Sequence, residues 1–412
     1  MDSFLQEHFT PYIICDIVSS PDGEEILLKD NAMIENNQSL KSGNRFERHK
    51  KLTLFLFVVV IILCIDLLAG EFFLTHPDPI RGRIANPYYH HGLEPMYHDI
   101  ESWGAGPYDF YTNSLGFKDN ANRVIPLTIN QHRIVFMGDS FTEGIGIPYS
   151  ETFVGRITET LKPRGYDVLD AGVASYAPTL YYIKTKYLLE HGLKFDELIV
   201  FIDLSDVQDE LFYKDWTPTT PDSWRTRYEN LTHTLDFFFE HHSLVYLHGL
   251  RPLILGEDKR RLRAFFFGGG RVTAEEAKYI ADRGRWTFDE RVYQEWGKDG
   301  VALEIARMND LYELCKKYHI KLSVGVYPWP VTIMNKDVNS RQISIWQNFA
   351  KEHAIDFYNI FPPFMATTTP VAKEVEIYYL PNDTHWTSAG HKVVADTWLA
   401  QYAQKNKETK IK

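Results

Sequence analysis

Cysteine is scarce in this chain of 412 residues, and the three cysteines, Cys15, Cys64 and Cys315, stand far apart. No C-x-x-C pair occurs, so the sequence predicts neither a zinc site nor a disulfide framework. A positive charge balance is also missing, because 44 Lys and Arg residues stand against 55 Asp and Glu residues, for a net charge of −11. Phosphate binding needs a basic surface, so this balance argues against nucleic acid as a partner.

Long apolar runs are missing too, with one exception. Residues 52–70 form an apolar run that Asp66 interrupts, and after Glu71 the run resumes to residue 74. Its length predicts a transmembrane helix over 52–74. A cleavable signal peptide is excluded because 51 residues precede the run. Asp66 either reaches the membrane interface or contacts another membrane helix, since a carboxylate inside a membrane is costly.

The basic residues around this run are distributed unevenly. Those before it are Lys41, Arg45, Arg48, Lys50 and Lys51, whereas only Arg81 and Arg83 follow closely. The positive-inside rule therefore predicts that residues 1–51 are cytoplasmic and that residues 75–412 lie outside. Residues 1–51 show no sustained periodicity, which predicts a mostly disordered tail.

A serine follows the clearest buried strand of the sequence. Residues 134–137 are apolar and predict a parallel strand, which Gly138-Asp139-Ser140 ends. A serine at the carboxyl end of such a strand lies where open α/β sheets bind ligands. It needs a base to become a nucleophile, and His385 is the candidate. Taken alone, Gly-Asp-Ser equally fits a turn in which the serine caps a helix.

Strands and helices alternate from residue 131 to 405. The expected strands are 133–137, 167–170, 197–203, 321–327 and 355–358, and the expected helices are 151–162, 178–192, 301–318, 338–353 and one from 388 onward. This alternation predicts a parallel, three-layer α/β domain. Residues 75–130 are rich in Pro, Gly, Tyr and His with little periodicity, and they predict a juxtamembrane segment laid over the domain.

Residues 211–300 interrupt this alternation. They are rich in aromatic residues and predict either a helical subdomain with its own small core or a lid over Ser140 that binds a glycan or a membrane partner. The glycines at 268–270 lack the Lys-Ser/Thr of a phosphate loop, so they predict a hinge or a turn.

The motifs resemble those of the GDSL/SGNH hydrolase superfamily. The first block is matched by Gly138-Asp139-Ser140, and the second, a glycine after a strand, by Gly172. The last block carries the catalytic Asp and His, here as D-x-H at Asp383 and His385 instead of the usual D-x-x-H. With the Trp that follows, this block resembles the SGNH-like proteins of bacterial alginate O-acetylation. The third block departs, because Ser205 stands where the family has Asn.

The resemblance implies an SGNH-type, flavodoxin-like three-layer fold without a metal or cofactor. Ser140 would be the nucleophile, His385 the base, and Asp383 the residue that orients the histidine. The oxyanion would be held by the N–H groups of Ser140 and Gly172, with the Ser205 hydroxyl as a third donor. Asp383-Thr-His385 also fits a purely structural role, as a helix cap beside a surface histidine.

Aromatic residues are expected to border the site. Tyr327 and Trp329 follow the end of a strand, and Trp386 follows His385. We expect all three to contact substrate. For Trp329, stacking on a sugar and filling of the core are equally supported by the sequence.

The resemblance implies a serine O-acyltransferase that transfers acetyl groups to a surface polysaccharide. It further implies a bacterial inner-membrane location, a periplasmic catalytic domain, and a polytopic membrane-bound O-acyltransferase partner that delivers the acyl group. A tethered carbohydrate esterase is the alternative. A third reading, motivated by Ser205, is an inactive glycan-binding scaffold.

Overall fold

The computed structural model of the chain describes residues 49–73, 82–101, 103, 106–214, 216–217, 239, 243–246, 283–365, 370–381 and 383–411. The chain divides into two compact units, Met1–Ala69 and Gly70–Lys412. The predicted disordered tail and most of the predicted insertion at 211–300 lie outside the described residues.

Helix α3, Lys50–Phe73, covers residues 52–73 of the predicted membrane span 52–74. By length and composition, Lys50–Gly70 is the one stretch of the described residues that could cross a membrane. Its apolar side chains are exposed; Phe55, for example, is 62% exposed and Ile65 61%. Asp66 differs from them, because it is only 8% exposed. Apolar surface of this extent fits a lipid environment better than water.

The second unit is built on an eight-stranded sheet with the order β10-β9-β8-β6-β7-β5-β4-β3. Its parallel strands are β6 (His132–Met137), β7 (Tyr166–Asp170), β8 (Glu197–Ile202), β9 (Lys321–Val326) and β10 (Asp356–Asn359). Numbered along the chain, these strands run 2-1-3-4-5, which is the flavodoxin-like order. The predicted parallel sheet is confirmed, and its order reverses between β6 and β8.

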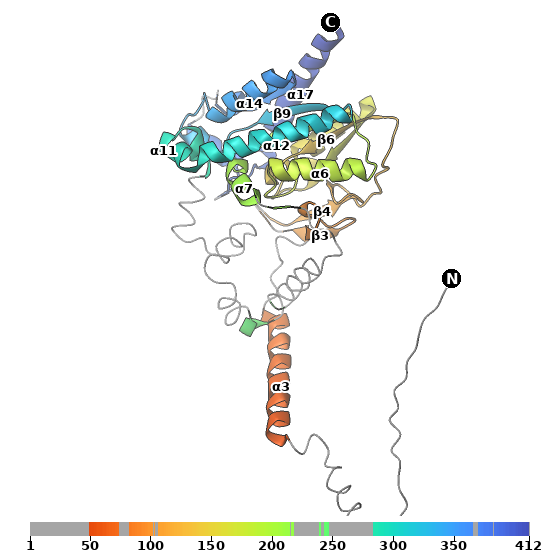
Figure 1. Cartoon of the computed structure of the whole chain (residues 1–412), viewed down its shortest axis with the longest axis vertical. Helices are drawn as coiled ribbons and strands as arrows, with labels where there is room; N and C mark the ends of the chain where they lie inside the picture. Colours follow the sequence, from red (N-terminus) through yellow and green to blue (C-terminus); the bar gives the residue numbers. More distant parts are fainter. Residues whose placement is uncertain are drawn as a thin grey trace, which may run out of the picture. The chain divides into compact units, whose positions relative to one another are not determined.

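Helices cover both faces of this sheet and complete three layers (Figure 1). On one face lie α6 (Pro178–Glu190), α12 (Lys298–Lys317) and α14 (Arg341–His353), and on the other lie α5 (Phe153–Leu161) and α17 (Ser388–Ile411). The side chains of β6 show how both faces are filled: Val135 and Met137 join the first core, and Ile134 and Phe136 the second. All four are fully buried, as expected for a strand covered on both faces.

The segment before β6 differs from the expectation. It forms a hairpin of β1 (Arg83–Asn86) and β2 (His90–Leu93), followed by β3 (His98–Glu101), β4 (Tyr108–Thr112) and β5 (Lys118–Asp119). The last three extend the main sheet with antiparallel pairing beside β7. The segment is thus part of the sheet and not an irregular cover. These strands have two to five residues, too few to show a period in the sequence.

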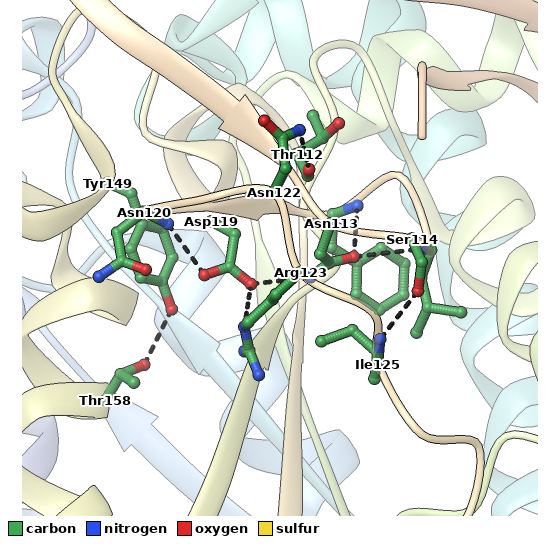
Figure 2. A network of polar contacts seen from close by, with 12 residues as sticks. Thr112, Asn113, Ser114, Asp119, Asn120, Asn122, Arg123, Ile125, Tyr149 and Thr158 are labelled. Carbon is green, nitrogen blue, oxygen red and sulfur yellow. Dashed lines mark hydrogen bonds and ion pairs between the residues drawn. The ribbon is translucent and has the colours of Figure 1, made fainter. Parts of the chain in front are cut away.

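A polar network stabilises the turn between β4 and β5 (Figure 2). Asp119 Oδ2 accepts hydrogen bonds from Asn113 Nδ2 at 3.0 Å and from Arg123 Nε at 2.7 Å. Gly116 has φ +66°, and a Cβ atom there would lie 2.3 Å from the carbonyl oxygen of Leu93. The turn therefore requires glycine at position 116. The close approach of Gly116 to Leu93 packs β2 against the β4–β5 connection.

A hollow of about 540 Å³ lies between residues 128–132, 192–196 and 318–320. These residues precede β6, β8 and β9, so the hollow is at the amino-terminal edge of the parallel strands. Ser140 follows β6 at the opposite edge, and this hollow is not part of its surroundings.

Candidate active site

Ser140 is placed by an abrupt strand-to-helix turn. Strand β6 ends at Met137, and Ser140 is the first residue of the short helix α4, Ser140–Glu143. Asp139 caps this helix, since its Oδ1 accepts the N–H of Phe141 at 2.9 Å. The cap is therefore Asp139 and not Ser140, whose hydroxyl lies 3.2 Å from Asp139 Oδ2. The site lies beside the reversal of strand order between β6 and β8, where open α/β sheets bind ligands.

Ser140, His385 and Asp383 form one chain of hydrogen bonds. The Ser140 Oγ atom lies 2.8 Å from His385 Nε2, and His385 Nδ1 lies 2.6 Å from Asp383 Oδ1. Both distances are within hydrogen-bond reach for a nucleophile, a base and the group that orients the base. The structure thus brings together the three side chains predicted for catalysis, although 245 residues separate Ser140 from His385.

The charges around the imidazole favour its protonated form. Burial lowers the pKa of His385, but the charge and hydrogen bond of Asp383, with the carboxylates of Asp139 and Asp203, outweigh burial and raise this pKa above its usual value. Burial raises the pKa of Asp383, and the charge and hydrogen bond of His385 outweigh it and lower the pKa well below the usual range. This pairing stabilises the imidazolium that forms when the serine gives up its proton.

We expect the activity on a small acetyl ester to fall on acidification as His385 takes up a proton. Its pKa is raised, so the midpoint of the acid limb of kcat/KM should lie above 6.5. Asp383→Asn removes the charge that raises the pKa of His385 most, so the midpoint should move to lower pH. The maximum rate should also drop by about 10⁴-fold, because the tautomer is no longer held. A pH–rate profile of both proteins checks this, and an unchanged midpoint in the variant would contradict it.

Two of the three predicted oxyanion donors are engaged by carboxylates. The Gly172 N–H donates to Asp170 Oδ1 at 3.1 Å. A Cβ atom at Gly172 would lie 2.5 Å from the Glu143 backbone nitrogen, so this glycine lies directly against α4. The Ser140 N–H, in contrast, has no acceptor among the described residues. It is the donor that the structure leaves free for an oxyanion.

The predicted role of Ser205 needs correction. Its Oγ donates to Asp203 Oδ1 at 2.5 Å, and its backbone N–H donates to the same oxygen at 2.7 Å. The hydroxyl is therefore committed to Asp203 and does not point to an oxyanion. The sequence showed that serine replaces the family's asparagine, but it did not show that a carboxylate two residues earlier would bind the hydroxyl.

The predicted substrate contacts of Tyr327, Trp329 and Trp386 also need correction. Tyr327 and Trp386 are 0% exposed and Trp329 is 5% exposed, so none presents a ring face to a sugar. The Tyr327 hydroxyl donates to Asp139 Oδ1 at 3.1 Å, and Trp329 Nε1 donates to Asp203 Oδ2 at 2.6 Å. These rings fill the core and orient carboxylates below Ser140. Tyr327 and Trp329 were correctly predicted to follow a strand, but the sequence did not show that all three rings are covered.

Three buried carboxyl groups lie beside the nucleophile. Among the described residues, Asp139, Asp203 and Asp206 are the group whose oxygen atoms, all within 4.8 Å, could hold a metal ion. Hydrogen-bond donors bind each of these groups; Tyr181, for example, donates to Asp206 Oδ2 at 2.8 Å, whereas Asp206 Oδ1 has no partner among the described residues. Burial first, and neighbouring carboxylates second, raise the pKa of Asp139 and of Asp206 well above their usual range. Asp139 and Asp206 therefore hold their protons to higher pH than exposed carboxyl groups do.

Trp103 is a contact of the triad that the sequence did not reveal. Its indole Nε1 donates to Asp383 Oδ2 at 2.7 Å. Nothing in the sequence connects residue 103 with a motif 280 residues further on, so no signal was available.

The fold and the site together define a class of protein. A Ser–His–Asp chain at the carboxyl edge of a parallel α/β sheet is the arrangement of serine enzymes that act on esters through an acyl-serine.

No family model and no curated protein matches the chain. Solved structures similar to it include an acetylxylan esterase from Geobacillus stearothermophilus, with 12% identity, a TM-score of 0.34, and coverage of 67% of this chain and 96% of the esterase. A GDSL-like lipase from Bacteroides thetaiotaomicron has 12% identity, a TM-score of 0.35, and coverages of 68% and 93%. The psychrotrophic esterase EstA from Pseudoalteromonas sp. has 8% identity, a TM-score of 0.36, and coverages of 67% and 99%. Because these TM-scores are below 0.5, we base the function on this chain's own residues.

Proposed function

We propose that this chain is a membrane-anchored serine O-acyltransferase of the GDSL/SGNH type, which acylates an extracytoplasmic polysaccharide through an acyl-enzyme on Ser140. The observation that carries the proposal is the unbroken chain of hydrogen bonds from Ser140 through His385 to Asp383. In a purely structural role, as a helix cap beside a surface histidine, the motif would not place the histidine Nε2 at the serine hydroxyl.

The residues perform the reaction in two half-reactions. In the first, the Ser140 Oγ attacks the acyl carbonyl carbon while His385 Nε2 takes its proton, and the Ser140 N–H donates to the oxyanion. His385 then returns the proton to the leaving oxygen, and the acyl group remains on Ser140. In the second, His385 takes a proton from the acceptor hydroxyl, whose oxygen attacks the acyl carbon. Collapse releases the new ester, and His385 restores the proton to Ser140.

The acceptor of the second half-reaction decides between transfer and hydrolysis. Support for transfer comes from α3, whose length and composition fit a membrane span, and from the basic residues that precede it. Acyl-coenzyme A is not expected outside the cytoplasm, so an outer transferase needs an acyl group delivered through the membrane. We therefore include a polytopic acyltransferase partner in the proposal, contacted by the helix around Asp66 and by the aromatic residues of 211–300.

A tethered carbohydrate esterase is the second candidate. It is favoured by the partial exposure of the triad, in which the His385 side chain is 13% exposed and that of Asp383 20%. Water can therefore reach the acyl-serine from solvent, and the same residues would then hydrolyse the ester.

Exchange of the membrane helix tests the transfer. Replacing residues 52–74 with an unrelated membrane anchor should leave turnover of small acetyl esters intact, because that reaction needs only the triad. It should lower glycan acylation in cells, because delivery of the acyl group fails. Both activities are to be measured in the same exchanged protein, with Ser140→Ala as the inactive control. Unaffected acylation would show that the helix is only a tether. A gain of acyl groups on the glycan after deletion of the gene would establish the esterase instead.

A further inference from the structure

Trp103 contacts the triad on the side opposite to the nucleophile. Its Nε1 atom lies 2.7 Å from Asp383 Oδ2, whereas His385 Nδ1 binds the other oxygen, Oδ1, at 2.6 Å. The Trp103 ring also meets the His385 ring edge to face, with 6.1 Å between centroids and 90° between planes. The indole is half-buried, so it covers one side of the Asp–His pair.

The two oxygens of Asp383 are held unequally. Oδ1 accepts from His385 Nδ1 and also from the backbone N–H groups of Thr384, at 2.6 Å, and His385, at 3.1 Å. Within the part of the chain that the structure describes, Oδ2 accepts from Trp103 alone. A carboxylate rotates about its Cβ–Cγ bond, so a donor on the second oxygen determines its plane. An indole suits this role because it is a donor only and cannot compete for the imidazole proton.

We propose that Trp103 is a positioning residue of the active site, whose indole N–H holds the Asp383 carboxylate in the plane that directs Oδ1 to His385. The inference rests on the proposed function, because it requires that Asp383 orients a catalytic histidine. The hydrogen bond from Trp103 is also among the influences that lower the pKa of Asp383, after burial, which opposes them, and after the charge and hydrogen bond of His385.

The strand before Trp103 is held firmly enough for such a role. Strand β3 ends at Glu101, which pairs with Tyr108 of β4. Glu101 is 1% exposed and accepts hydrogen bonds from Arg83 Nη1 at 2.7 Å and from the Tyr108 hydroxyl at 2.6 Å. Arg83 also pairs with Glu143 of α4, the helix that begins at Ser140. The segment between the membrane helix and β6 thus contacts Asp383 of the triad and the helix that begins at Ser140.

The test removes the indole N–H and keeps an aromatic ring at position 103. Trp103→Phe is the first variant, and incorporation of 3-benzothienylalanine at position 103, which has sulfur in place of the N–H, is the second. We expect kcat on a small acetyl ester to fall about 10- to 100-fold, the effect of a hydrogen bond to a charged group, with KM within about twofold of the parent. Trp346→Phe is the matched control; Trp346 is buried in the core on one face of the sheet and packs against Phe349, and its exchange should leave both constants unchanged.

A second readout does not depend on turnover. The proton on His385 Nδ1, observed by NMR in the ¹⁵N-histidine-labelled full chain in detergent, should move upfield in both Trp103 variants and stay in place in the control. A kcat within twofold of the parent and an unmoved resonance in the sulfur analogue would overturn the inference. If the parent protein shows no ester turnover, the proposed function fails, while the resonance still decides whether Trp103 orients Asp383.

Discussion

Ester turnover should disappear when Ser140 is replaced by Ala, and equally when His385 is replaced by Ala. We expect kcat to fall by about 10⁶-fold in each variant, because the hydrogen bond of 2.8 Å between Ser140 Oγ and His385 Nε2 makes the two residues one functional unit. For the same reason the double variant should be little worse than either single one. Hydrolysis of a small acetyl ester by purified full-length protein measures all three.

Folding has to be separated from chemistry in this experiment. Ser140→Ala removes a single oxygen atom, so its circular dichroism and melting temperature should match those of the parent. Trapping of an acyl group on Ser140 in the parent, and its loss in the variant, would identify the nucleophile directly. Retention of most of the activity in Ser140→Ala would show that another residue attacks the ester. A parent without any turnover would favour the inactive glycan-binding scaffold.

Among the substitutions considered for this chain, Arg83→Met should lower the free energy of unfolding most. The Arg83 side chain is 8% exposed and lies between two acidic side chains, Glu101 at 1% and Glu143 at 0% exposure. Removal of the cation leaves two buried carboxylates without their charge partner. Breaking a buried pair in this way typically costs about 3–5 kcal/mol. We expect a loss of this size in the free energy of unfolding from urea titration of the domain.

A second substitution distinguishes charge from packing. Adding Glu143→Gln to Arg83→Met removes one of the stranded charges, so part of the lost stability should return. Arg307→Met is the matched control, because Arg307 forms an exposed pair with Asp310 and should change the free energy of unfolding by less than about 1 kcal/mol. If Arg83→Met is as mild as this control, the buried cluster does not stabilise the fold as we describe.

The parallel core was predictable because its strands are short apolar runs separated by segments with helical periodicity. Ile134 to Met137 illustrate the signal: the residues are apolar on both faces because helices cover both faces of the sheet. Strands β3 to β5 escaped prediction because polar residues occupy seven of their eleven positions and because they gain order by pairing with one another and, through β5, with β7. Tertiary contacts decided their structure, not local preference.

The candidate site was predictable to the extent that its residues stand in motifs. Ser140, Asp383 and His385 were found by their spacing and their neighbours, and the structure places them within hydrogen-bond distance. The direction of a side chain within its loop is not encoded in a motif. For that reason the sequence did not show that Ser205 turns to Asp203 or that Trp329 is closed into the core.

The triad and its positioning residue come from both ends of the domain, and this has a consequence for folding. Trp103 enters before the first parallel strand, Ser140 follows that strand, and His385 comes immediately before the last helix. Contacts between residues this far apart in the chain form late, because the loops that separate them must close first. A chain that still lacks its carboxyl-terminal residues therefore has no assembled triad. Ester turnover becomes a reporter of the completed fold, and truncation before α17 should leave a protein without activity.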